Sequence, residues 1–171
     1  MRAFVRFIDM VLAGFGISIL GIMVICVVWQ VISRYVLSTP SVGTDEAARL
    51  FFMCLGLIGG AYTAGQRRHL AIDLLPNYMN PQSRRALGIF VEIFVLAFAA
   101  VILFYGGGML AIDTFQSNQT SPVMGVPMGY IYLSIPISGA LIVFYSILTI
   151  IEQSFGVSFR ETAAPTGPID V

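Results

Sequence analysis

Two neighbouring carboxylates and an arginine stand where the second apolar run of the chain begins. In the stretch TDEAARLFF, Asp45 and Glu46 precede Arg49 by four and three residues. On a helix these spacings place opposite charges on one face, where either carboxylate can pair with the guanidinium. Charged groups are costly beside lipid, so the cluster either forms a local ion pair near the membrane surface or faces a protein partner. We expect Glu46 and Arg49 to be enclosed, between helices or against another subunit.

Part of this cluster also has a purely structural interpretation. Thr44 is a suitable N-cap, and acidic residues in the first turn complement the positive end of the helix dipole. Arg34, at the end of the first apolar run, offers a further cation. Capping accounts for the acids but not for Arg49, which lies inside the apolar run.

Glu92 is a second candidate, because it lies about two turns inside the third apolar run. A carboxylate within a membrane span is a candidate for proton transfer. It can also pair with Arg85, or with the group of Arg67, Arg68 and His69, and we favour pairing. The alternative is a self-contained, proton-coupled small transporter that uses Glu92 as its titrating group.

The sequence shows no set of residues suited to catalysis or to cofactor binding. His69 is the only histidine, whereas haem and metal sites need several ligands. No nucleophile with a base, phosphate-binding glycine loop or carboxylate dyad is apparent. The nine basic residues are all arginines and are balanced by nine acids, so no basic field exists that would attract nucleic acid. We expect no enzyme activity, metal site, cofactor or nucleic-acid partner.

The elements that position these groups are apolar segments. Hydrophobic residues form 57% of the chain and charged residues only 11%, compared with about 25% charged in soluble domains. Four segments reach the roughly 20 apolar residues that a membrane-spanning helix needs. They lie at about residues 7–32, 47–65, 87–112 and 128–151. We predict an all-α, integral membrane four-helix bundle in the lipid bilayer, forming one domain over residues 1–160, with a flexible cytoplasmic tail at residues 161–171.

The arginines predict the orientation of these spans, because basic residues concentrate in cytoplasmic loops. Two precede the first span, four lie between the second and third, and one follows the fourth. These are Arg2, Arg6, Arg67, Arg68, Arg84, Arg85 and Arg160. The loops on the opposite side have Arg34 alone. We therefore predict that both termini are cytoplasmic.

Small residues mark places where helices can approach one another closely. Gly56, Gly60 and Ala64 recur every four residues on one face of the second span. We expect this face to pack within the bundle, with a subunit interface as the alternative. Three consecutive glycines at residues 106–108 either loosen the third span or let another backbone come close. Pro136 is expected to kink the fourth span.

The stretch from Trp29 to Pro76, which contains RYVLSTPSVGTDEAARLFF and ends in RRHLAIDLLP, carries a family pattern. It resembles the small membrane (DctQ-like) subunit of tripartite ATP-independent periplasmic, or TRAP, transporters. In that pattern an Arg-Tyr pair ends the first helix, an acidic pair and Ala-Arg open the second, and His, Asp and Leu-Pro occupy the cytoplasmic loop. The corresponding residues here are Arg34, Tyr35, Asp45, Glu46, Ala48, Arg49, His69, Asp73, Leu75 and Pro76. One departure is that many relatives have a tryptophan before the acidic pair, where this chain has residues 42–44, VGT.

The resemblance implies partners and a function. Such small subunits bind a large permease subunit, which moves substrate by an elevator-like mechanism coupled to the sodium gradient. A periplasmic substrate-binding protein delivers an organic acid, such as a C4-dicarboxylate or a sialic acid. The resemblance thus implies a scaffold in the bacterial inner membrane that also helps to dock the binding protein. The subunit-interface or structural candidates are Arg34, Asp45, Glu46, Arg49, Gly56, Gly60, His69, Asp73 and Glu92.

Overall fold

The computed structural model describes residues 2–66 and 81–155, and the regular structure within these residues is helical. The helices are α1 (Arg2–Tyr35), α2 (Val42–Gly65), α4 (Pro81–Phe98), the π-helix η2 (Ala99–Gly106), α5 (Gly107–Gln116), α6 (Met128–Tyr132) and α7 (Ser134–Phe155). Four stretches are long and apolar enough to span a membrane: Val5–Tyr35, Val42–Gly65, Ala86–Gln116 and Met128–Glu152. The predicted all-α architecture with four membrane-spanning helices is confirmed. The predicted tail at residues 161–171 lies outside the described residues.

Helix α2 begins about one turn earlier than the predicted span. Ser41 precedes the helix in an extended conformation, and its backbone N–H donates a hydrogen bond to the Ser33 hydroxyl at 3.2 Å. Thr44 is already inside the first turn, where its hydroxyl donates to the Ser41 carbonyl at 3.1 Å. The expected N-cap at Thr44 is therefore wrong. The Thr44 hydroxyl donates to a carbonyl of the preceding turn, as serine and threonine hydroxyls do inside helices. The N-cap position is occupied by Ser41.

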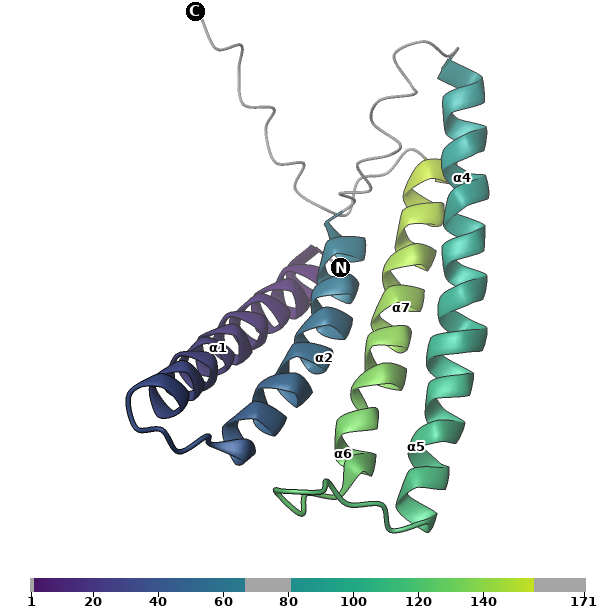
Figure 1. The fold of residues 1–171 in the computed structure, drawn as a ribbon. Helices are drawn as coiled ribbons and strands as arrows, with labels where there is room; N and C mark the ends of the chain where they lie inside the picture. The colour runs from purple at the N-terminus through teal and green to yellow at the C-terminus, as the bar shows by residue number, and fades with distance from the viewer. Residues whose placement is uncertain (1, 67–80, 156–171) are drawn as a thin grey trace, which may run out of the picture.

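The helices lie side by side in the order α1, α2, α7 and then the rod formed by α4, η2 and α5 (Figure 1). In the span Met128–Glu152, which consists mostly of α7, 39% of the most apolar stretch is buried, compared with 6% in the span formed by α1. α7 is therefore the central helix and α1 an exposed edge. We call the end of this row that carries the connections 36–41 and 117–127 the loop end, and the end where α1 begins and α7 finishes the terminal end.

Near the terminal end, α1 contacts α7 directly, beside the last residue of α2. The Tyr145 hydroxyl donates a hydrogen bond to Asp9 Oδ1 at 2.5 Å, and the tyrosine is fully buried. Val5 and Leu148 belong to the same buried cluster. A Cβ at Gly65 would lie only 2.9 to 3.1 Å from carbon atoms of the Tyr145 ring. The absence of a side chain at Gly65 thus lets the Tyr145 ring pack against α2.

The third span packs closely against α7 at two glycines. A Cβ at Gly139 would lie 2.7 Å from the backbone nitrogen of Phe104, which belongs to η2. A Cβ at Gly107 would lie 2.5 Å from Cγ2 of Ile135, whereas one at Gly108 would meet nothing within 4 Å. Within the glycine triplet, the close neighbour is therefore a side chain of α7 at Gly107, and not the backbone that we expected.

The fourth span is interrupted at Leu133, between α6 and α7. The Ser134 hydroxyl donates to the Ile131 carbonyl at 2.6 Å. Pro136 has no N–H to donate to the carbonyl four residues earlier, so the regular helical bonding pattern fails here. The expected irregularity is present as a break three residues before the proline.

Candidate functional site

Asp45 connects two helices at the loop end. Gln30 of α1 donates a hydrogen bond from Nε2 to Asp45 Oδ1 at 2.5 Å, and Arg49 pairs with Asp45 Oδ2 at 2.7 Å. The side chains of Arg49 and Asp45 are 78% and 44% exposed, respectively. The predicted ion pair at a spacing of four residues is present, and it is an exposed pair in this chain. Asp45 therefore joins α1 to α2 while it neutralises Arg49.

Glu46 has a different partner, because the next residue on a helix points about 100° away around the axis. Its Oε2 accepts hydrogen bonds from the backbone N–H groups of Val123 at 3.1 Å and Met124 at 2.9 Å. These donors lie in the connection between α5 and α6. The expectation that Glu46 and Arg49 form one enclosed pair within the chain is wrong, since Arg49 pairs with Asp45 and is exposed.

The connection 117–127 folds into a compact loop. The Ser121 N–H donates to the Val126 carbonyl at 2.9 Å, and the Gly125 N–H donates to the Ser121 carbonyl at 3.1 Å. Gly125 has a φ of +65°, a left-handed conformation that glycine adopts without strain. Ser121 is 3% exposed, whereas Val123 and Met124 at the tip are half exposed. The loop thus has an ordered base and an apolar tip.

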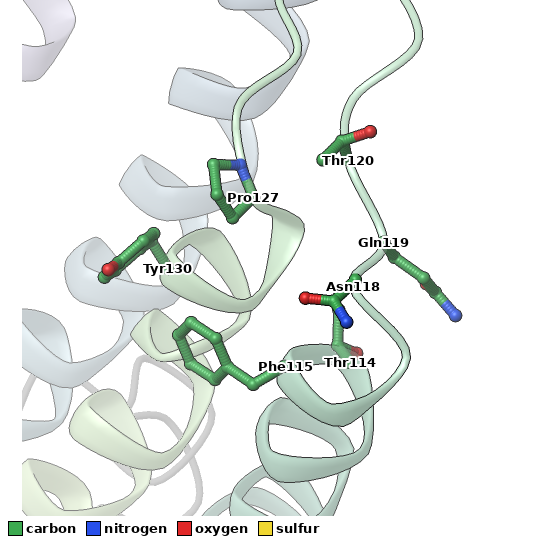
Figure 2. Close-up of a pocket in the computed structure, with 7 residues that line it drawn as sticks. All are labelled: Thr114, Phe115, Asn118, Gln119, Thr120, Pro127 and Tyr130. Carbon is green, nitrogen blue, oxygen red and sulfur yellow. The ribbon is translucent and has the colours of Figure 1, made fainter.

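A shallow hollow of about 210 Å³ lies beside this loop. It is lined by Thr114, Phe115, Asn118, Gln119, Thr120, Pro127 and Tyr130 (Figure 2). The rings of Phe115 and Tyr130 meet edge to face at 5.1 Å between centroids. The Thr114 hydroxyl donates to the Leu110 carbonyl at 2.7 Å and is therefore already satisfied. The lining carries no charge, and we assign no ligand to it.

The small-residue face of α2 does not pack inside the chain. Gly56 and Gly60 are exposed, and a Cβ at either position would meet nothing within 4 Å. Phe52, on the same face, is 68% exposed. The buried residues of α2, such as Ile58 and Ala61, lie on its other side. The expectation that the glycines pack within the bundle is wrong, because α1 and α7 contact α2 elsewhere.

The other predicted residues lie apart from this cluster. Arg34 is exposed and makes no ion pair with a described residue. Glu92 is 7% exposed on α4, the helix that packs against α7. The arginines expected to pair with Glu92 fall where side chains are not described, so that pairing stays a prediction. His69 and Asp73 lie outside the described residues.

Sequence reasoning missed two polar residues that join helices, Gln30 and Asp9. Each is a polar side chain inside an apolar run, and a polar group in a membrane span is itself a signal for a helix contact. The donors on Val123 and Met124 gave no such signal, because backbone N–H groups are present at every residue except proline.

Within residues 2–66 and 81–155, no group of three His, Cys, Asp or Glu side chains is placed to hold a metal ion. Cys26 and Cys54 are both free and half buried. The polar contacts described at the loop end join α1 to α2 and α2 to the connection 117–127.

The family model described as "Tripartite ATP-independent periplasmic transporters, DctQ component" matches residues 23–156. The match begins within α1 and extends to the end of α7. It therefore includes Asp45, Glu46 and both of the segments that they hold.

Three similar proteins place the match in context. A putative TRAP transporter small permease protein of Haemophilus influenzae is 26% identical over 155 residues, which cover 91% of this chain and 94% of that protein. The sialic acid TRAP transporter small permease protein SiaQ of Vibrio cholerae is 28% identical, with 76% and 75% covered. The sialic acid TRAP transporter permease protein SiaT of H. influenzae is 29% identical over 75% of this chain, but the match covers only 20% of SiaT. Other similar small permease proteins are named for ectoine and for C4-dicarboxylate.

Proposed function

Because the chain belongs to the DctQ family of TRAP transporter components, we propose that it scaffolds the large permease subunit and helps to dock the periplasmic substrate-binding protein. The matched proteins are transporter permease subunits and not enzymes. The observation that carries the scaffold proposal is the match to one fifth of SiaT. In SiaT, a segment similar to this chain is part of the same polypeptide as the rest of the permease. Where the small subunit is a separate chain, we expect it to bind the large permease through a noncovalent contact.

In this proposal the transported substrate is an organic acid, such as a C4-dicarboxylate or a sialic acid, and uptake is coupled to sodium. The similar proteins are named for sialic acid, ectoine and C4-dicarboxylate, and each of these compounds carries a carboxylate. The substrate and sodium sites belong to the large permease, and the small subunit acts by holding it.

The proposed location is the bacterial inner membrane, with both termini in the cytoplasm and the loop end at the periplasm. The distribution of arginines supports this orientation, since seven of the nine precede the first span, lie between the second and third spans or follow the fourth in the sequence. The loop end then offers residues 36–41 and 117–127 to the soluble binding protein.

We assign the contact with the large permease to one exposed face of α2, which carries Arg49, Phe52, Gly56 and Gly60. Glycines four residues apart allow another helix to approach closely, and here no described residue of the chain fills that space. Arg49 adds no net charge to such an interface, because Asp45 neutralises it. Glu92 is assigned a packing role between α4 and α7. Arg34, His69 and Asp73 stay subunit-interface or structural candidates.

The test is affinity purification of the tagged chain from cells that express the neighbouring genes. The unaltered chain should recover a multi-span permease. Gly60→Leu should recover several-fold less, since overpacking costs about 1–3 kcal/mol. Gly21→Leu is the matched control, because Gly21 is an exposed glycine on α1 where an added Cβ would meet nothing within 4 Å.

The outcomes separate the parts of the proposal. Recovery of the chain with copies of itself alone would contradict the scaffold role and would favour the self-contained transporter that uses Glu92. Full recovery of the permease with Gly60→Leu would place the interface elsewhere than on this face of α2.

A further inference from the structure

Glu46 binds a segment that is distant in the sequence. The two donors of its hydrogen bonds are consecutive backbone N–H groups, 77 and 78 residues along the chain, and both bond to the single oxygen Oε2. One carboxylate oxygen thus fixes two adjacent peptide groups. A charged acceptor forms stronger hydrogen bonds than a neutral one, so this contact is suited to holding a loop.

The loop presents these donors because its internal bonds use other groups. The bonds from Ser121 and Gly125 close the base of the loop. The N–H groups of Val123 and Met124 have no acceptor within the loop and point to Glu46. The buried Ser121 hydroxyl lies beside the same carboxylate. The loop therefore offers two adjacent backbone N–H groups to one carboxylate oxygen.

The neighbouring carboxylate is not equivalent. Asp45 is occupied by Gln30 and Arg49, which join α1 to α2. Glu46 joins α2 to the connection between the third and fourth spans. Two successive acids thus hold two different parts of the loop end.

We propose that Glu46 is a positioning residue that anchors the tip of the connection 117–127 to α2. The anchor holds the half-exposed side chains of Val123 and Met124 in one place at the loop end. There they form part of the surface that the substrate-binding protein contacts. The anchoring itself is independent of the proposed function, and its role in docking rests on that function.

The anchor is tested by amide hydrogen exchange on the full chain in lipid nanodiscs. In Glu46→Ala, the amides of Val123 and Met124 should exchange about tenfold faster or more, because they lose a charged acceptor. Glu46→Gln should give an intermediate rate, since its amide oxygen still accepts hydrogen bonds. Asp45→Asn is the matched control and should leave these amides unchanged. Unchanged protection of α7 amides would show that the variants are folded. Equal exchange in Glu46→Ala and the unaltered chain would overturn the anchor.

The docking role is tested on the complex with the large permease. Its affinity for the purified binding protein encoded beside it should fall several-fold in Glu46→Ala, with the yield of the complex unchanged, and recover in part in Glu46→Gln. A looser loop with unchanged affinity would overturn the docking role. If the unaltered complex does not bind the binding protein, the proposed function fails, while the exchange result still decides the anchor.

Discussion

The ring of Tyr145 leaves no room for a side chain at Gly65. A Cβ at this position would lie 2.9 Å from the ring, and the fully buried ring is held by the hydrogen bond to Asp9. Gly65→Ala should therefore destabilise the chain by about 1–3 kcal/mol, through displacement of a packed side chain. The measurement is the midpoint of thermal unfolding in detergent, followed by circular dichroism.

Gly60→Ala is the control for this change. The helix is the same, but a Cβ there meets nothing within 4 Å, so alanine should leave the midpoint unchanged or raise it slightly. Equal midpoints for the two alanine variants would contradict the packing role of Gly65.

At the same scale, the sequence predicts a contact when both partners are charged side chains close together on one helix. The pair of Asp45 and Arg49 has a spacing of four residues, and the structure confirms it. The partners of Glu46 could not be predicted, because they are backbone groups of another segment. Gln30 was within reach of prediction, since a carboxamide inside an apolar run needs a polar partner.

Between the elements, η2 and α7 approach each other closely at Gly139. A Cβ there would lie 2.7 Å from the Phe104 nitrogen and 2.9 Å from the carbonyl carbon of Leu103, and backbone atoms cannot rotate away. Gly139→Ala should therefore separate the third and fourth spans and cost about 1–3 kcal/mol or more. SDS-induced unfolding of the purified chain measures this cost.

Gly108→Ala serves as the comparison in the third span, because its Cβ would meet nothing within 4 Å. It should unfold at nearly the same SDS concentration as the unaltered chain. If Gly139→Ala unfolds there as well, the close approach of η2 and α7 does not contribute to stability.

The number of spans and the limits of the fourth, Met128–Glu152, could be predicted from apolar length alone, whereas the limits of the second and third helices could not. α2 begins at Val42 and the rod of the third span continues from Pro81 to Gln116. Polar residues at membrane surfaces still form helical hydrogen bonds, so a helix extends beyond its apolar run. The π-helix had no sequence signal, because its apolar residues also suit an α-helix.

For the molecule as a whole, the order of the helices was not predictable. Lipid tails are as apolar as the surfaces of the four spans, so the hydrophobic effect does not favour one pairing of helices over another. Length is more informative: residues 7–32 form an apolar helix of roughly 39 Å, compared with about 30 Å for the hydrocarbon core. A tilt of α1 would accommodate the extra length, and Figure 1 shows α1 inclined relative to α7.

Orientation across the membrane depends on the arginines, and it decides which partner each end can meet. With the loop end at the periplasm, Ser117 faces the outside and Ser83, near the start of α4, faces the cytoplasm. Single cysteines are placed at these positions by Ser117→Cys and Ser83→Cys in a chain with Cys26→Ala and Cys54→Ala. An impermeant thiol reagent should label Ser117→Cys in intact cells, because Ser117 is exposed.

Ser83→Cys should react with the same reagent only after the cells are permeabilised, and labelling of both variants under those conditions is the control for reactivity. Labelling of Ser83→Cys but not Ser117→Cys in intact cells would reverse the orientation. The connection 117–127 and its anchor at Glu46 would then face the cytoplasm, where a periplasmic binding protein cannot reach them. The docking role of the loop end thus depends on this measurement, whereas the close contacts at Gly65 and Gly139 do not.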